Sequence, residues 1–508
     1  MSEGTRDGVS RRAALGAVGA GIAGVAAGAG FYAADAADSD DVTGAAPLFT
    51  VAQWKRQRGS RFLIAHRGSG DVLPEHSMAG YEAAVQWGAR CMEVSVGATS
   101  DGVLVCMHDT TYDRTTDTTG ALDSMPSTIL RGVGLRSPQL GPAWTTDPLP
   151  SVPLFEEVLR RFGGRLILCV EAKDDAAYPA MIAMVERHGL QNCVIVKAYY
   201  QSKSIEPAKK AGYPLFAYFG KAVGADEVRA LAKRLDRSRD LLVISPAGSG
   251  PAGDGIDVDV VKAAVATRVP VLIAPVHRRW EVAQYFGLGV GGAVCSSFGY
   301  LNRKTAVATA DTWRYKAIAA GEMTKHPDDP SLAPSWTGPD ELTLDRAGSQ
   351  QFITLGQLSP VANAAQTYRI DFAARWTTRP ASPDSSITLA FGHGDDRYYE
   401  NRVGLGDGYH ALLRADGRLE LFSHQAGTQQ GNQLASTVAT AAPKAGAWLS
   451  LRLDVTPTTL TWSRTDGTAP AAVTVDVPGR GGGYLHIGRS AEDGVLAFRR
   501  FVVKLISP

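Results

Sequence analysis

Residues 61–96 read RFLIAHRGSGDVLPEHSMAGYEAAVQWGARCMEVSV and contain the repeat that decides the fold. An apolar run at 62–65 is followed by a helix-like segment at 77–87 and by a second apolar run at 91–96. Apolar, β-rich runs that alternate with helical segments are typical of parallel strands buried on both faces. The stretch therefore predicts a β–α–β unit.

The same alternation continues along the first three fifths of the chain. Eight apolar runs follow one another, at residues 62–65, 91–96, 166–171, 193–197, 215–219, 241–245, 271–275 and 293–296. A further run at 103–107 follows the second too closely for a crossover helix, so we expect it in a loop excursion. Eight βα units within about 250 residues predict an α/β (β/α)8 TIM barrel over residues 61–325, with its chemistry at the C-terminal ends of the strands. A doubly wound open sheet is the alternative.

The pattern changes after residue 325. Residues 326–339 are rich in Pro, Ser and Asp and are interpreted as a linker. In residues 340–508, short alternating runs recur about every ten residues between turn signals such as Asp416-Gly417. This predicts an all-β, jelly-roll-like sandwich. Its rhythm resembles that of concanavalin-type, laminin-G-like modules, which implies a carbohydrate or cell-wall binding module; a folded appendage without a ligand is the alternative.

The N-terminus has the features of an export signal. Arg11 and Arg12 precede a weakly apolar run of Ala, Gly and Val that extends to about Ala34. Paired arginines before such a run are typical of twin-arginine signals, here over residues 1–37, with 38–60 as the N-terminal segment of the mature protein. We expect a secreted or cell-wall associated protein with no stable transmembrane insertion after cleavage. A retained N-terminal anchor is the alternative.

Composition excludes several classes of protein. The chain of 508 residues has 52 Lys+Arg against 51 Asp+Glu, and a formal charge of +1 does not favour a nucleic-acid partner. A hydrophobic fraction of 44% argues against disorder over most of the chain. Five cysteines in a chain of this length do not form a disulfide framework.

Chemically versatile side chains gather at the predicted ends of the first three barrel strands. They are His66, Arg67, Glu75, Glu93, Ser95, His108, Glu171 and Lys173. Two histidines can divide general acid and general base between them near neutral pH. Carboxylates from neighbouring strands suit a hard divalent cation, and guanidinium and ammonium groups suit a phosphate. This inventory predicts cleavage of a phosphodiester.

The order of these motifs resembles that of the glycerophosphodiester phosphodiesterase family, a branch of the phospholipase C-like TIM-barrel phosphodiesterases. The motifs that carry the resemblance are His66-Arg67-Gly68, Pro74-Glu75-His76, Glu93-x-Ser95, His108-Asp109, Arg114-Thr115-Thr116 and Glu171-x-Lys173. Each motif alone is weak, and their order and spacing make the match specific. The resemblance extends from residue 61 to about residue 301 and does not include the sandwich.

The resemblance implies roles for these residues. His66 and His108 would be catalytic, and Arg67 and Lys173 would bind the phosphate of a small phosphodiester. Glu93 and Glu171 would hold Ca²⁺ or Mg²⁺, with Glu75 supporting either the cation or Arg67. The implied reaction, in lipid metabolism, is hydrolysis of a glycerophosphodiester to glycerol 3-phosphate and an alcohol. The identity of the alcohol is not implied.

Ser95 departs from the family pattern, which has a second acidic residue at this position. A neutral hydroxyl is a poorer ligand for Ca²⁺ or Mg²⁺ than a carboxylate. We expect weaker metal binding, or a substitute oxygen from Asp109, Asp174 or water. Two other functions stay open: a lysophospholipid or teichoic-acid-type phosphodiesterase, and a non-catalytic surface-binding protein on a barrel scaffold.

Overall fold

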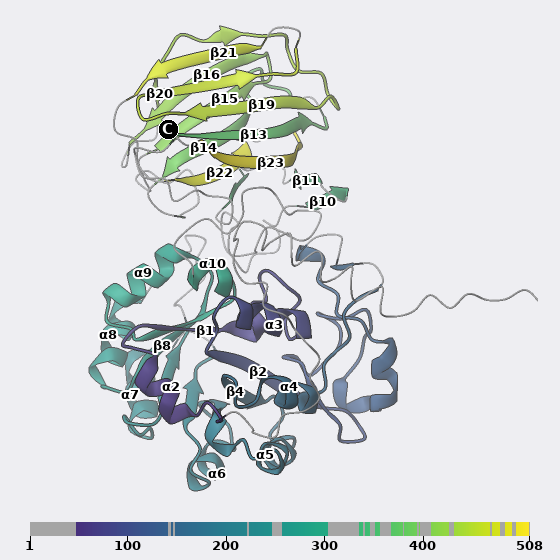
Figure 1. Ribbon diagram of the computed structural model, residues 1–508, viewed down its shortest axis with the longest axis vertical. Helices are drawn as coiled ribbons and strands as arrows, with labels where there is room; N and C mark the ends of the chain where they lie inside the picture. The colour runs from purple at the N-terminus through teal and green to yellow at the C-terminus, as the bar shows by residue number, and fades with distance from the viewer. Residues whose placement is uncertain are drawn as a thin grey trace, which may run out of the picture.

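The computed structural model gives the chain as two domains, shown in Figure 1. It describes residues 47–302, 335–345, 351–355 and 367–506, apart from 141–143, 146–147, 221–222, 246–256, 339–340, 379, 394–395, 397–407, 426–430, 468–469, 478–482 and 490–493. The predicted export signal lies outside the described residues, and so do residues 326–334 of the predicted linker. Within the described part, no helix is long and apolar enough to cross a membrane.

The first domain is a closed parallel barrel. Its strands are β1 (Phe62–Ala65), β2 (Cys91–Ala98), β4 (Ile167–Ala172), β5 (Val194–Tyr199), β6 (Leu215–Tyr218), β7 (Leu241–Ile244), β8 (Val271–Val276) and β9 (Gly292–Cys295). Because β1 pairs in parallel with both β9 and β2, the sheet closes on itself. This confirms the TIM barrel and excludes the open sheet. The remaining strand, β3 (Leu104–Cys106), pairs antiparallel with β2, as the predicted loop excursion requires.

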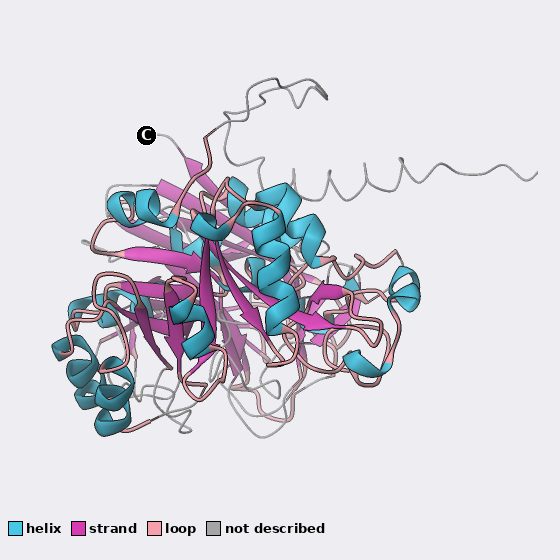
Figure 2. Cartoon of the chain, turned by 90° about the horizontal axis from the view of Figure 1, so that it is seen from below, coloured by secondary structure: helices cyan, strands magenta, loops and turns pink. Residues whose placement is uncertain are grey.

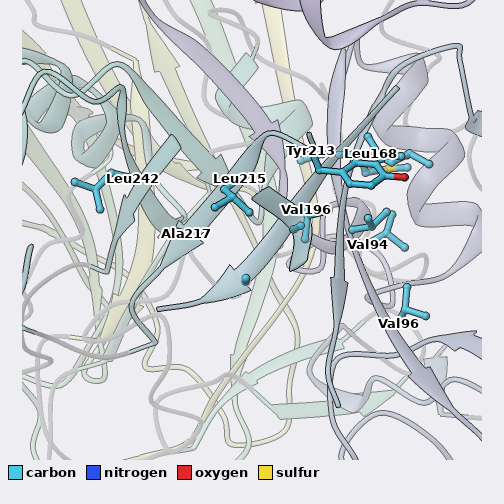
Figure 3. Close-up of a cluster of buried hydrophobic side chains, with 14 of the residues drawn as sticks. Val94, Val96, Leu168, Val196, Tyr213, Leu215, Ala217 and Leu242 are labelled. Carbon is cyan, nitrogen blue, oxygen red and sulfur yellow. The ribbon is translucent and has the colours of Figure 1, made fainter. Parts of the chain in front are cut away.

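Helices surround the barrel, as Figure 2 shows. They are α3 (Met78–Gln86), α4 (Phe155–Phe162), α5 (Tyr178–Arg187), α6 (Ile205–Lys210), α7 (Ala225–Ala232), α8 (Val258–Ala266), α9 (Arg279–Gly287) and α10 (Phe298–Asn302). Side chains alternate along each strand, so one set faces the helices and the other faces the barrel interior. Val94, Leu168, Val196 and Leu215 belong to the outward set, which forms a buried apolar layer (Figure 3).

The barrel interior is closed at its N-terminal end by a helix that precedes the first strand. This helix, α2 (Val51–Gln57), begins at Thr50, whose side chain accepts a hydrogen bond from the backbone N–H of Gln53. Trp54 of α2 is 2% exposed and packs with Phe62 and the inward-facing strand residues. The barrel domain therefore begins before residue 61, inside the segment predicted to precede it. Sequence periodicity did not reveal α2 because the helix is only two turns long.

The second domain contains two antiparallel sheets. In the described residues, one has the order β10-β11-β23-β13-β19-β20-β21 and the other β12-β22-β14-β15-β16-β17, with β18 also paired to β16. Their bounds are β10 (Ser335–Gly338), β11 (Glu341–Leu344), β12 (Gln351–Thr354), β13 (Thr367–Trp376), β14 (Ser386–His393), β15 (Gly408–Arg414), β16 (Arg418–His424), β17 (Asn432–Gln433), β18 (Val438–Ala439), β19 (Leu449–Val455), β20 (Thr459–Arg464), β21 (Ala471–Asp476), β22 (Tyr484–Arg489) and β23 (Leu496–Ile506).

Apolar side chains from both sheets of this domain form one core. Ile370 and Leu453 enter it from the first sheet, and Leu389 and Ile487 enter it from the second. Both sheets therefore contribute to a single buried core, and the antiparallel sheets that the alternating pattern predicts are confirmed. The first strand, β10, pairs antiparallel with β11, so the domain begins inside the segment predicted as a linker.

The two domains meet at the start of α9 and at α10 (Figure 1). The carboxylate of Asp396 accepts hydrogen bonds from the backbone N–H groups of Arg279 and Trp280, at 2.7 and 2.9 Å. It also accepts one from the hydroxyl of Tyr300, at 2.7 Å. Asp396 is 1% exposed. A buried carboxylate at the N-terminus of α9 satisfies N–H groups that have no partner within the helix.

Candidate active site

The chain turns sharply where β1 ends, and this turn carries two of the predicted site residues. His66, Arg67 and Gly68 form a short 3-10 turn in which Arg67 has a φ of 51°. A left-handed conformation is uncommon for a residue other than glycine and tends to occur at functional sites. Gly68 has a φ of 75°, and a Cβ atom there would lie 2.9 Å from the backbone of Gly80. The glycine of the His-Arg-Gly motif is therefore required by the backbone conformation of the turn, whereas His66 and Arg67 supply its chemical groups.

Glu75 is held by two arginines. The Nη1 of Arg67 donates to both of its carboxylate oxygens, at 3.1 and 3.2 Å. Arg114 donates to the same two oxygens at 2.8 and 2.9 Å. Burial raises the pKa of Glu75, but Arg67 and Arg114 outweigh it and lower that pKa far below its ordinary value. Glu75 therefore holds the guanidinium of Arg67 in place.

His108 follows β3, in the excursion that pairs with β2. Its Nδ1 is 2.7 Å from Oδ1 of Asp109, and Arg114 in turn donates to both oxygens of Asp109. The Nε2 of His108 is 3.3 Å from Nζ of Lys173. The carboxylate fixes the orientation of the ring, so that Nε2 faces the site.

The charged side chains of the barrel interior meet around one lysine that the sequence analysis did not single out. Lys197 of β5 donates through Nζ to Oε1 of Glu93 at 3.0 Å and to Oε2 of Glu171 at 2.6 Å. Lys173 donates to Oε1 of Glu171 at 3.2 Å. The hydroxyl of Tyr218 on β6 also donates to that oxygen. Strands β2, β4, β5 and β6 therefore contribute to a single cluster.

This cluster connects the two predicted catalytic histidines. The Nε2 of His66 is 3.9 Å from Oε1 of Glu93, while its Nδ1 is 2.7 Å from Oγ of Ser296. A continuous series of contacts runs through His66, Glu93, Lys197, Glu171, Lys173 and His108. Both imidazoles therefore have Nδ1 bonded to a supporting side chain and Nε2 directed at the same group of charges.

Burial lowers the pKa of both imidazoles in the free protein, so both rings favour the neutral form. The pKa of His66 is lowered well below its ordinary value by burial and by the positive charges of Arg67 and Lys197. The pKa of His108 is also lowered, by burial and by the positive charges of Arg67, Lys173 and Lys197, and the hydrogen bond to Asp109 offsets only part of that shift. The two histidines therefore differ: His66 is the more strongly held in the neutral form.

The donor set does not fit the calcium or magnesium ion that the sequence suggested. Glu93 and Glu171 come together as expected, but the ammonium of Lys197 lies between them. Ser95 is fully buried beside them and adds no charge. Across the part of the chain that the structure describes, no group of three or more His, Cys, Asp or Glu side chains is arranged to hold a metal ion. The carboxylates are already paired with ammonium groups.

The part of the chain that contains the site residues of β1 to β5 matches a known protein family. Residues 66–212 match the family model described as the glycerophosphoryl diester phosphodiesterase family. These residues carry a glycerophosphoryl diester phosphodiesterase family domain. The matched region includes every predicted site residue and also Lys197, whereas Tyr218 and Ser296 lie beyond it.

Several curated relatives share the glycerophosphodiester phosphodiesterase name. The chain is 32% identical over 141 residues to the glycerophosphodiester phosphodiesterase of Bacillus subtilis, which covers 25% of this chain and 46% of that protein. It is 49% identical over 76 residues to human glycerophosphodiester phosphodiesterase 1, covering 15% and 23%. The chain thus spans less than half the length of these curated relatives.

Comparison with solved structures gives matches of low similarity. An Oleispira antarctica phosphodiesterase in complex with the product sn-glycerol-3-phosphate is 19% identical, with a TM-score of 0.39, covering 47% of this chain and 94% of that one. A putative glycerophosphoryl diester phosphodiesterase from Silicibacter pomeroyi is 19% identical, with a TM-score of 0.38, covering 47% and 90%.

The structure also brings together residues of the sandwich that looked unrelated in the sequence. His393, His410, His424 and His486 come from four neighbouring strands, and ring centroids lie 4.8 Å apart for His393 and His486 and 5.5 Å apart for His410 and His424. Their spacing along the chain shows no ligand pattern, so the sequence alone does not group them. Only the pairing of the strands makes them neighbours.

Proposed function

We propose that the barrel hydrolyses glycerophosphodiesters to glycerol 3-phosphate and an alcohol by acid–base catalysis with two histidines. One observation carries the proposal: the Nε2 atoms of His66 and His108 both face the cluster around Lys197, at opposite ends of one series of contacts. A phosphate held above this cluster has one imidazole on each side. The names of the curated relatives support the same reaction.

His66 is suited to be the general base. Burial and two nearby cations lower its pKa, so the ring is neutral near pH 7 and can accept a proton at Nε2. Ser296 holds Nδ1 and fixes the direction of the ring. The proton comes from the nucleophile, which is either water or the neighbouring glycerol hydroxyl; the second of these passes through a cyclic phosphate.

His108 is suited to be the general acid. Its hydrogen bond to the Asp109 carboxylate stabilises the protonated ring and raises the pKa against the effect of burial. An anionic phosphodiester adds further negative charge beside the ring and favours protonation in the complex. His108 then donates its proton from Nε2 to the oxygen of the departing alcohol.

Positive charge around the site offsets the charge that develops on the phosphoryl oxygens. Arg67 is held at the mouth by Glu75, and Lys173 lies between Glu171 and His108. The side chains of Arg67 and Lys173 are 16% and 14% exposed, so both groups are accessible and only partly hydrated. Charges fixed before the reaction in a partly dry site stabilise a transition state more strongly than they would in water.

The test is release of glycerol 3-phosphate from glycerophosphocholine by the wild type and by the variants His66→Ala and His108→Ala. We expect each variant to be about 10²–10⁴-fold slower. His188→Ala is the matched control, because the ring of His188 pairs with Glu156 away from the site. Equal rates in all four proteins would contradict the assignment, and an inactive wild type would favour the non-catalytic surface-binding protein.

A second candidate is favoured by the position of the sandwich. Asp396 binds the start of α9, which directly follows β8, and Tyr484 accepts a hydrogen bond from Arg279 at 3.3 Å. The sandwich therefore lies beside the C-terminal ends of the strands, where TIM barrels carry their chemistry. This placement suits a polymeric substrate of the teichoic-acid type. One segment of the polymer would enter the barrel site while another segment contacts the sandwich.

Comparing two substrates separates these candidates. If the polymer is the substrate, Asp396→Asn should slow hydrolysis of polyglycerolphosphate and leave hydrolysis of glycerophosphocholine unchanged. The control is Asp384→Asn, which changes an exposed aspartate of the sandwich that pairs with Arg418. Equal effects of Asp396→Asn on both substrates would count against the polymer.

Export by the twin-arginine route is part of the proposed function. It is supported by the paired Arg11 and Arg12 before an apolar run. Replacing both arginines with lysine should leave the protein inside the cell, whereas replacing the nearby Arg6 should not. Unchanged export of the double variant would exclude this route.

A further inference from the structure

We infer that Lys197 takes the place of a divalent cation in this barrel, so that the reaction proposed above, on which this inference rests, proceeds without Ca²⁺ or Mg²⁺. The position of one atom carries the inference. Nζ of Lys197 lies 3.0 Å from Oε1 of Glu93 and 2.6 Å from Oε2 of Glu171, the two carboxylates that the sequence predicts as metal ligands. The ammonium therefore bridges the two groups that a cation would have to bridge.

The backbone directs Lys197 into this position. Ile195 packs in the barrel interior, and Lys197 follows two residues later on β5, so its side chain points to the same side. Ile195 lies beside Cys169 of β4, and two residues further along that strand is Glu171. The ion pair between Lys197 and Glu171 is therefore fixed by the register of β5 with β4 and not by a flexible loop.

The ammonium is buried and is paired with both carboxylates. The side chain of Lys197 is 8% exposed, and those of Glu93 and Glu171 are 2% and 4% exposed. A buried charge persists only when it is paired, and here each charge has its partner. Removing the ammonium would leave two carboxylates facing one another.

Ser95 gives the second, independent observation. It is directly opposite Glu171 in the pairing of β2 with β4, and it is fully buried. Its hydroxyl has no hydrogen-bond partner among the described residues. A carboxylate at this position would add an oxygen ligand and a negative charge beside Glu171. With serine there, the two carboxylates are balanced by Lys197 and Lys173, and a divalent cation would give the cluster an uncompensated positive charge.

The geometry is that of hydrogen bonds and not of a coordination shell. Ca²⁺ binds about six to eight oxygens at roughly 2.3–2.6 Å, and Mg²⁺ binds six at roughly 2.0–2.1 Å. Around Lys197 the acceptors are two carboxylate oxygens, and the ring of Tyr218 lies 4.4 Å from Nζ. An ammonium over an aromatic face is further stabilised by the ring, whereas a hard divalent cation prefers oxygen ligands.

The experiment uses the full chain and two independent measurements. The first is release of glycerol 3-phosphate from glycerophosphocholine with EDTA, with added Ca²⁺ and with added Mg²⁺. The second is binding of Ca²⁺ or Mg²⁺ by isothermal titration calorimetry, which does not depend on activity. We expect the wild-type rate to change less than about twofold with EDTA, where a lost electrostatic donor would cost about 10²-fold or more. We expect no saturable heat from either metal.

Variants test the role of the lysine directly. Lys197→Met should lower the rate by about 10²–10³-fold, and Lys197→Arg should retain more activity because it keeps the charge. The double variant Ser95→Asp with Lys197→Ala should bind Ca²⁺ and become sensitive to EDTA. The control is Lys209→Met, which removes a half-buried lysine that pairs with Glu206 on α6, away from the cluster around Lys197.

The outcomes separate this inference from the proposed function. Loss of wild-type activity with EDTA and recovery with Ca²⁺ would overturn the inference and leave the function in place. A wild type that is inactive in every buffer would overturn the function, and the calorimetry would still decide on Lys197. Saturable Ca²⁺ or Mg²⁺ binding by the wild type overturns the inference, even where the variants do not fold; its absence supports the inference.

Discussion

Nδ1 of His108 lies 2.7 Å from Oδ1 of Asp109, and this contact determines which ring nitrogen is available to a substrate. The carboxylate is itself held by Arg114 through two hydrogen bonds. The ring of His108 therefore has a fixed orientation, and the Asp109 carboxylate stabilises its protonated form. The equivalent partner of His66 is the neutral hydroxyl of Ser296, so the two histidines are supported differently.

Removing the Asp109 carboxylate should alter the pH dependence of the rate. Burial lowers the pKa of His108 and the Asp109 hydrogen bond raises it, so Asp109→Asn should lower that pKa further. A general acid acts in its protonated form, so the alkaline limb of kcat/KM should move to lower pH. The measurement is the pH profile of kcat/KM on glycerophosphocholine. Asp113→Asn, in the same loop but without a contact to His108 among the described residues, should leave the profile unchanged; a shift to higher pH in Asp109→Asn would refute the acid role.

Ser296 should matter for the orientation of His66 rather than for binding. The contact between the Ser296 hydroxyl and Nδ1 of His66 is 2.7 Å long. A hydrogen bond of this kind contributes about 1 kcal/mol, which corresponds to roughly a fivefold effect on rate. Ser296→Ala should therefore lower kcat about fivefold with little change in KM. The neighbouring variant Ser297→Ala, which loses a contact with Asp71 instead, is the comparison. If KM rises and kcat stays constant, Ser296 contacts the substrate.

The Glu171 carboxylate should make the barrel sensitive to acid. Burial raises the pKa of Glu171, but Lys197 and Lys173 outweigh it and hold that pKa at about 2. Because this value is below that of the unfolded chain, the stabilisation is present above about pH 4.5 and is lost as the pH falls towards 2. The loss is on the order of 3 kcal/mol. Urea denaturation at a series of pH values measures it.

Two substitutions serve as controls for this acid sensitivity. Glu171→Gln should flatten the dependence of unfolding free energy on pH in the acid range, because the amide does not titrate. Glu206→Gln changes an exposed glutamate of α6 and should leave the curve of the wild type intact. An unaltered acid transition in Glu171→Gln would mean that other carboxylates, such as Glu75, dominate it.

The turn after β1 should tolerate no side chain at Gly68. A φ of 75° and a Cβ atom 2.9 Å from the backbone of Gly80 should together make Gly68→Ala destabilising by about 2–4 kcal/mol. Gly59 has a φ of 69° and nothing within 4 Å of its Cβ position. Gly59→Ala should thus cost only the conformational part, about 1 kcal/mol. Thermal denaturation measures both, and equal losses in the two variants would show that steric overlap with Gly80 contributes nothing.

Local pattern was enough to predict much of the fold. Apolar runs such as residues 91–96 alternate with amphipathic segments, and this alternation depends only on residues close together in the sequence. The eight barrel strands, the excursion at β3 and the change to antiparallel sheets after the barrel all follow from it. Short elements escaped detection: α2 and β10 are too brief to show a period, so both domains extend beyond their predicted limits.

The residues of the candidate site also fall into two groups: those that local motifs predict and those that only the fold brings together. His66, Arg67, Glu93, His108 and Glu171 follow from motifs in which neighbouring residues act together. Lys197 has no such motif: it lies 26 residues from Glu171 and 104 from Glu93. Ser296 is 230 residues from His66.

The sequence by itself determined the strand–helix alternation and the kinds of chemistry at the strand ends, because these depend on side chains a few positions apart. The tertiary structure alone decided which charges meet. Closure of the barrel places β9 beside β1, and the register of β4 with β5 puts Ile195 beside Cys169, two residues before Lys197 and Glu171. A long-range ion pair depends on strand register and barrel closure, and neither is encoded in the spacing of residues within one segment.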